Sequence, residues 1–168
     1  CHLPLNRETS LPHFLRAHLP PERVGPGHEL LLSPAHRRFV EMEYAFNAED
    51  AIAAFGALRE QLLRSEEADR WPVQMRPAGR DTAWLGRPFD CGVTLSVHAT
   101  PPGDNTFFDN IERTFIEHGG RPHLGKRHDV TRARACLPCL ADFANAAGQL
   151  DPDLRFRNDY LHTLLDHA

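Results

Sequence analysis

Large apolar residues and polar residues come close to alternating in two stretches of the chain, and this pattern predicts two β-strands. The first stretch is residues 39–46, where aromatic and aliphatic side chains are interspersed with glutamates. The second is residues 92–100, where valine and leucine alternate with polar residues. Because successive side chains of a strand point to opposite faces, each strand should bury one face and expose the other. A further strand is expected at residues 72–78.

A repeat close to 3.6 residues predicts a helix directly after the first strand. Asn47 can cap the N-terminus of this helix with its side-chain oxygen. Its expected buried face consists of Ile52, Phe55, Leu58 and Leu62. The capping residue and the apolar spacing together indicate an amphipathic helix that packs on the sheet.

Two more helices are expected in the second half of the chain. One begins at Asp104 or Asn105 and ends at the glycine pair 119–120, since glycine readily ends a helix. Its core-facing residues are expected to be Phe108, Ile111 and Phe115. A third helix is expected over residues 131–147, ending at Gly148.

The order of these elements predicts an α+β fold: a split β-α-β arrangement, in which an antiparallel sheet carries helices on one face. Residues 1–36 contain six prolines and no sustained period, which is typical of an extended linker or arm. Residues 37–150 are expected to form the α+β domain. Residues 151–168 form a tail whose large apolar side chains need a surface to cover.

Composition narrows the class of protein further. A chain of 168 residues with 41% hydrophobic residues suits one compact domain with tails. Its formal net charge of -4 argues against a general nucleic-acid binder. No apolar run long enough to span a bilayer and no secretory leader is present, so we expect a cytoplasmic protein. A start at Cys1 without an initiator methionine suggests a piece of a longer polypeptide.

Residues 118–128 are the most unusual segment and the first candidate for a functional site. They bring together three histidines, three cationic residues and three glycines. Glycine permits backbone angles and close approaches that other residues do not, and Pro122 favours an extended conformation at Arg121. The segment therefore looks like a functional site and not like a spacer.

Four separated segments, in the same order, resemble one family of flavoenzymes. They are Phe39-Val-Glu-Met-Glu-Tyr-Ala, Val73-Gln-Met-Arg76, Gly119-Gly-Arg-Pro-His-Leu-Gly-Lys126 and Asp151-Pro-Asp-Leu-Arg-Phe-Arg-Asn-Asp-Tyr-Leu161. These segments are similar to the C-terminal half of the D-arabinono-1,4-lactone, L-gulonolactone and alditol oxidases, which belong to the vanillyl-alcohol oxidase superfamily. The resemblance extends over roughly residues 36 to 165.

The resemblance implies a substrate-binding domain that covers the flavin ring while a separate N-terminal domain of the same protein holds FAD. The expected substrate is a sugar lactone or an alditol, which is oxidised by hydride transfer to FAD. No glycine-rich phosphate loop is found in this sequence, so we expect the isolated chain to be inactive. The tail at 151–168 is expected to dock on the FAD domain. Membrane association of the parent enzyme is left open.

The resemblance also assigns catalytic roles to three residues. Arg76 and Lys126 are expected to stabilise the substrate oxygen on which charge develops, and Lys126 also to contact the flavin. His98 is expected to accept or relay the hydroxyl proton. Each has a plainer alternative: a surface ion pair for the arginine, a solvated side chain for the lysine, and a structural hydrogen bond for the histidine.

Three further residues are expected to contact the substrate: Gln74, Thr100 and His123. Gln74 stands where the family usually has glutamate, so it can orient a polyol but cannot act as a base. Leu124 replaces a usual tryptophan and removes a flat aromatic wall. Both departures suggest an altered substrate preference. His123 is expected chiefly to hold the shape of the loop.

Three other hypotheses are kept open beside the flavoenzyme. A zinc site could be formed by His123, His128, Cys136 and Cys139, although both cysteines fall within the third predicted helix; we therefore assign no metal site. A free-standing domain of this fold could instead bind a small molecule or a protein partner without catalysis. An anion or RNA contact through the basic residues near 121–134 ranks last, because few aromatic residues lie nearby to stack on bases.

Overall fold

The structure is a computed structural model that describes residues 25–26, 38–65, 72–87, 89–100 and 105–166. The chain divides into two units, Cys1–Arg38 and Phe39–Ala168. Nearly all of the expected linker at 1–36 lies outside the described residues. The elements of the second unit are β1 (Val40–Asn47), α3 (Ala48–Leu62), β2 (Gln74–Ala78), β3 (Gly92–Ala99), α4 (Asn105–Glu117), β4 (Arg121–Pro122), α5 (Val130–Ala135), α6 (Leu140–Leu150) and α7 (Asp159–Leu165).

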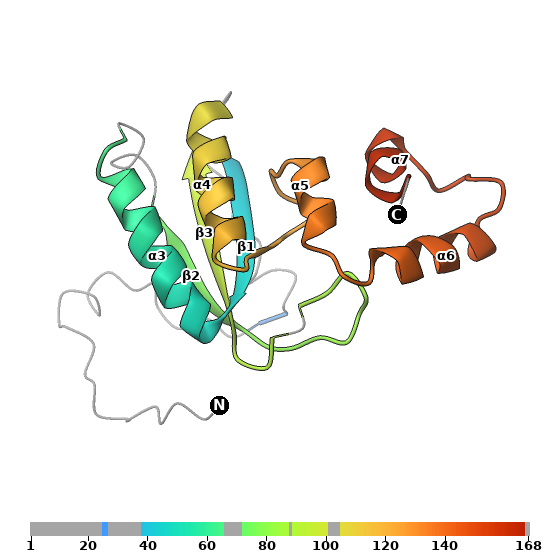
Figure 1. The fold of residues 1–168 in the computed structure, drawn as a ribbon, viewed down its shortest axis with the longest axis horizontal. Helices are drawn as coiled ribbons and strands as arrows, with labels where there is room; N and C mark the ends of the chain where they lie inside the picture. Colours follow the sequence, from blue (N-terminus) through green and yellow to red (C-terminus); the bar gives the residue numbers. More distant parts are fainter. Residues whose placement is uncertain (1–24, 27–37, 66–71, 88, 101–104, 167–168) are drawn as a thin grey trace. The chain divides into compact units, whose positions relative to one another are not determined.

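The strands form one antiparallel sheet in the order β2-β3-β1-β4. β1 pairs with β3 along its whole length, from Val40 opposite Ala99 to Asn47 opposite Gly92. Helices α3 and α4 cover one face of this sheet (Figure 1). The predicted α+β fold, a split β-α-β sheet with helices on one face, is confirmed.

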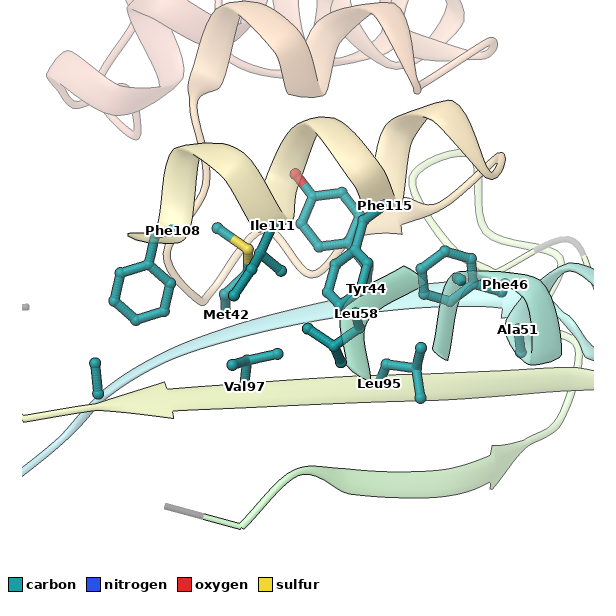
Figure 2. Packing of buried hydrophobic residues seen from close by; sticks show 12 residues of the cluster. Met42, Tyr44, Phe46, Ala51, Leu58, Leu95, Val97, Phe108, Ile111 and Phe115 are labelled. Atoms are coloured by element: carbon teal, nitrogen blue, oxygen red, sulfur yellow. The ribbon is translucent and has the colours of Figure 1, made fainter. Parts of the chain in front are cut away.

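The main core lies between that sheet face and the two helices. Figure 2 shows side chains of β1 and β3 that point toward the helices, and side chains of α4 that point toward the sheet. The largest fully buried residues here include Met42, Tyr44, Phe46, Leu95, Phe108, Ile111 and Phe115. The alternation of apolar residues in β1 and β3 and the predicted face of α4 are therefore confirmed.

The expected buried face of α3 is wrong in two of its positions. Ile52 is 75% exposed and Phe55 37% exposed, whereas Ala51, Ala54 and Leu58 are buried. The apolar period is present, but the helix is rotated so that two alanines face the sheet. Small side chains let the helix backbone approach the sheet closely, and this packing overrides the larger residues' preference for burial.

The single helix expected at 131–147 is two helices, α5 and α6, with a turn at residues 136–139 between them. Pro138 lies in this turn. Proline has no N–H to donate and its ring collides with the carbonyl four residues earlier, so a continuous helix cannot pass through it. The expected end at Gly148 is also wrong, because α6 continues to Leu150.

A second, smaller core holds the C-terminal segment to α5 and α6. Its buried residues are Leu137, Leu140, Leu164 and Leu165. The expected tail therefore contains a helix, α7, that packs on neighbouring helices of the same chain. Docking of residues 151–168 on a further domain stays a prediction. No helix among the described residues has the length and apolar character needed to cross a membrane.

Candidate functional site

The face of the sheet opposite the helices is polar. Cross-strand partners point to the same side of a sheet, so the register decides which side chains meet there. Glu41 lies opposite His98, and Glu43 lies opposite Ser96. On the other side of β3, Ser96 lies opposite Gln74. Five residues from three strands that are distant in sequence thus form one continuous polar surface.

A hollow of about 520 Å³ lies over this surface. It is bounded on one side by β2 and on the other by the segment that follows β4. The polar and charged residues lining it are Glu41, Glu43, Gln74, Arg76, Arg87, Thr94, His98, His123 and Lys126. The hollow is large enough for a small ligand, and its walls carry mainly hydrogen-bonding groups.

The segment after β4 places Lys126 beside the sheet. His123 donates its backbone N–H to the carbonyl of Glu43 at 2.9 Å, and Arg127 donates to the carbonyl of Glu41 at 2.9 Å. Between these anchors the chain turns, with the N–H of Lys126 bonded to the carbonyl of His123 at 3.0 Å. The Nδ1 atom of His123 accepts the N–H of Gly125, so this side chain holds the turn.

Arg76 and Lys126 are each held by one buried carboxylate of β1. The ammonium group of Lys126 donates to Oε2 of Glu41. The guanidinium group of Arg76 donates to Oε2 of Glu43 at 2.5 Å, and the Ser96 hydroxyl donates to the same oxygen at 2.9 Å. Both carboxylates are at least nine-tenths buried. These ion pairs fix where the two cationic groups lie.

The hydrogen bond of His98 determines which of its ring nitrogens can accept a proton. Nδ1 lies 3.2 Å from the carbonyl oxygen of Pro72, and a carbonyl only accepts, so Nδ1 carries the hydrogen. In the neutral ring, Nε2 is then an acceptor. Nε2 lies 3.8 Å from Oε1 of Glu41, and the edge of the ring meets Phe39 at a centroid distance of 5.2 Å.

Comparison with known proteins identifies the family. Residues 7–164 match the family described as D-arabinono-1,4-lactone oxidase. The chain belongs to the D-arabinono-1,4-lactone oxidase family. The resemblance found in the sequence is thereby confirmed.

Two relatives show how much of such a protein this chain represents. L-gulono-1,4-lactone dehydrogenase of Mycobacterium tuberculosis is 31% identical over 133 residues, covering 76% of this chain and 31% of the relative. Alditol oxidase of a Streptomyces species is 30% identical over 162 residues, covering 93% of this chain and 35% of the relative. The chain thus spans about a third of the length of these relatives. Both relatives carry the names of oxidoreductases.

Five of the six residues singled out in this member of the D-arabinono-1,4-lactone oxidase family line the same hollow. They are Gln74, Arg76, His98, His123 and Lys126. Thr100, the sixth, follows the end of β3, is exposed and does not line the hollow. The structure therefore places the three expected catalytic side chains around one hollow.

Sequence reasoning missed the two glutamates that organise the site. Glu41 and Glu43 occupy the polar positions of the first predicted strand, so their common face could have been read from the alternation. The cations that pair with these glutamates could not be predicted in this way, because Lys126 and Arg76 come from distant segments of the chain. Arg87 was missed as well. It lines a neighbouring pocket together with Arg121, which the sequence had placed only in the unusual segment 118–128 and among the basic residues of a possible anion contact.

The residues of the zinc hypothesis do not converge in the described part of the chain. No group of three or more His, Cys, Asp or Glu side chains is placed there to hold a metal ion. His128 instead bonds the Tyr160 hydroxyl at 3.0 Å, and the Cys136 thiol donates to the carbonyl of Arg132. Burial raises the pKa of the Cys136 thiol above its ordinary value, which disfavours the thiolate that a metal requires.

Proposed function

We propose that this chain is the substrate-binding domain of a flavin-dependent oxidoreductase that oxidises a sugar lactone or an alditol by hydride transfer to FAD. Membership of the family and the names of the relatives support this proposal. The observation that carries it is the polar hollow lined by His98 and by the cationic groups of Arg76 and Lys126, each of which is held by a buried glutamate.

The two cations are suited to stabilise an oxygen that gains negative charge. When a carbinol carbon loses hydride, its hydroxyl must also lose a proton, and charge develops on the oxygen. Fixed cationic donors lower the barrier because they need no reorganisation at the moment of reaction. Glu41 and Glu43 supply this fixation to Lys126 and Arg76 respectively.

His98 is the residue best placed to take the hydroxyl proton. Its Nδ1 is occupied by the carbonyl of Pro72, which leaves Nε2 as the accepting atom. Protonation would place a positive ring 3.8 Å from Oε1 of Glu41, and this carboxylate would stabilise the imidazolium. His98 is 93% buried, so the proton would move within the hollow and away from bulk solvent.

FAD, when bound, supplies the hydride acceptor. The open polar face fits such a partner, because Lys126 lies at the hollow with a third of its side chain accessible and can place positive charge beside the flavin ring. No glycine-rich phosphate loop occurs in the sequence, so we propose that an N-terminal domain of the same protein holds the rest of the cofactor. The short span of this chain relative to its relatives supports that division.

The substrate would be recognised through its hydroxyl groups. Gln74 has an amide that both donates and accepts hydrogen bonds, and it lines the hollow on the β2 side. His123 lines the opposite side. A polyol chain or a lactone ring placed between them meets polar groups on two sides, which suits both substrate types named among the relatives.

The test uses the intact protein that carries this chain. We expect purification to yield a flavin absorption spectrum and the bound flavin to be reduced anaerobically by an aldono-1,4-lactone or an alditol. A matched sugar without a free hydroxyl at the reacting carbon serves as the negative substrate. A colourless protein, or a bound flavin that neither substrate class reduces, would contradict the proposal.

A further inference from the structure

Arg121 is a buried cation without a carboxylate partner among the residues that the structure describes. The residue is only 8% exposed, and Nη1 of its guanidinium donates to the carbonyl of Gly86 at 2.5 Å. In the part of the chain that the structure describes, no carboxylate oxygen lies within ion-pair distance of this group. A guanidinium has five N–H donors, so one carbonyl leaves most of its hydrogen-bonding capacity for another acceptor.

The nearest candidate within the chain, Asp81, is already engaged by its own loop. Its carboxylate accepts the backbone N–H groups of Ala83 and Arg87, each at 3.0 Å, and Nε of Arg87 lies 3.9 Å away. The hydrogen bond from the backbone of Arg87 is the main reason that the pKa of Asp81 is lowered. Arg121 acts on Asp81 only at longer range.

Arg121 borders a pocket of about 300 Å³ that adjoins the hollow described above. The pocket is lined by Asp81, Gly86, Arg87, Arg121, His123 and Gly125, among others. Glu43, Arg87, Thr94 and His123 line both cavities. A single ligand can therefore extend from the hollow into the pocket.

The charges around the two cavities are unbalanced. The described residues that line them include four cations, Arg76, Arg87, Arg121 and Lys126, and three carboxylates, Glu41, Glu43 and Asp81. Burying an unpaired charge is costly, and such a cation is usually matched by an anion. The excess is one positive charge, which the negative charge of one carboxylate would balance.

We propose that the pocket at Arg121 is a subsite for a carboxylate, and that its ligand is an aldonate whose hydroxyl chain lies in the adjoining hollow. This inference rests on the proposed function of that hollow as a carbohydrate site. An aldonate is the ring-opened acid of an aldonolactone, so it carries the same hydroxyl groups and one terminal carboxylate. The guanidinium of Arg121 supplies paired donors that match carboxylate geometry.

The test compares two ligands in the unaltered, intact protein by anaerobic isothermal titration calorimetry, with the flavin reduced beforehand so that neither ligand can be oxidised. D-Gluconate and D-glucitol have the same carbon chain and differ only at C1, which is a carboxylate in one and a primary alcohol in the other. A charged hydrogen bond is worth roughly 10- to 100-fold in affinity, so we expect gluconate to bind tighter by about that factor. The ratio of the two affinities, gluconate over glucitol, should fall as salt is added.

Variants assign this preference to Arg121. Arg121→Gln should bring the two affinities within about threefold of each other, because it removes the charge. Arg121→Lys, which keeps the charge but loses the planar fork, should retain part of the preference. Arg59→Gln, on the exposed side of α3, is the control and should leave it unchanged. Circular dichroism confirms that each variant is folded.

The outcomes separate this inference from the proposed function. Equal affinities for gluconate and glucitol would overturn the subsite while leaving a polyol site in the hollow. Binding of neither ligand would count against both. A preference for gluconate that persists in Arg121→Gln would overturn the assignment of the carboxylate to Arg121.

Discussion

The hydroxyl of Tyr44 donates a 2.7 Å hydrogen bond to Oε1 of Glu112, and both side chains are almost completely buried. The same carboxylate accepts the backbone N–H of Asp129 at 2.7 Å and an N–H of Arg132 at 2.7 Å. One glutamate therefore ties β1 and α4 to the start of α5. Since α5 follows directly after the segment that carries Lys126, this network holds the C-terminal end of that segment in place.

Removing Glu112 should therefore destabilise the fold strongly. We expect Glu112→Ala to lower the free energy of unfolding by about 3 kcal/mol, because it leaves Arg132 and two hydrogen-bond donors without their partner. Tyr44→Phe should cost about 1 to 3 kcal/mol. Urea denaturation measures both values. Glu117→Ala, at the exposed end of α4, should change stability by less than about 0.5 kcal/mol. Equal losses in all three variants would show that the network has no special role.

The two tyrosines of the chain should ionise only at unusually high pH. Burial, reinforced by the bond to Glu112, raises the pKa of Tyr44, and burial raises the pKa of Tyr160. The ordinary value is about 10. The folded state thus favours the neutral phenols, so their contribution to stability is fully present below about pH 10 and is lost as the pH rises further. Phenolate absorbance should stay low in the folded protein at pH 10. As the control, the tyrosines of the protein unfolded in urea should ionise at about pH 10. Tyrosines that ionise at the same pH in the folded protein would contradict this prediction.

Two glycines should respond in opposite directions to alanine. A Cβ at Gly120 would lie 2.6 Å from the carbonyl oxygen of Phe115 and 2.7 Å from Cε1 of Phe46, so Gly120→Ala should cost about 1 to 3 kcal/mol. Gly56 lies inside α3, and beyond the adjoining residues and backbone of the helix itself no atom lies within 4 Å of such a Cβ. Gly56→Ala should therefore add about 0.5 to 1 kcal/mol, because alanine favours the helix. Thermal and urea unfolding of the two variants measure both changes in stability. A Gly120→Ala variant as stable as the unaltered protein would contradict the first prediction and show that the backbone around residue 120 can relax.

Loss of Arg76 or Lys126, the two cations held by buried glutamates, should slow the proposed reaction. Lys126→Ala and Arg76→Ala should each reduce the rate of flavin reduction by a lactone or an alditol about 10²- to 10³-fold, while FAD remains bound in the intact protein. Stopped-flow absorbance measures the rate, and the flavin spectrum reports cofactor content. Arg80→Ala, whose exposed partner is Asp90, is the matched control. Unchanged reduction in both site variants would refute the roles assigned to these cations.

Much of the fold and part of the site could be predicted from the sequence. The strands β1 and β3, the N-cap at Asn47 and the inward face of α4 follow from patterns of a few residues. Such patterns reflect local geometry, in which side chains alternate along a strand and repeat every 3.6 residues along a helix. The break between α5 and α6 also had a local signal, Pro138, which the longer apolar pattern outweighed.

The sequence by itself thus determined which residues of each strand share a face, because that depends only on the backbone's own repeat. It also determined, through the four matching segments, the family to which the chain belongs. Only the tertiary structure decided that alanines rather than Ile52 and Phe55 face the sheet, since burial depends on how closely two elements approach. It alone decided that Glu41 holds Lys126 and that Arg121 is buried with no carboxylate beside it in the described part of the chain. Those contacts join residues far apart in the chain, and no local pattern encodes the register and turns that bring them together.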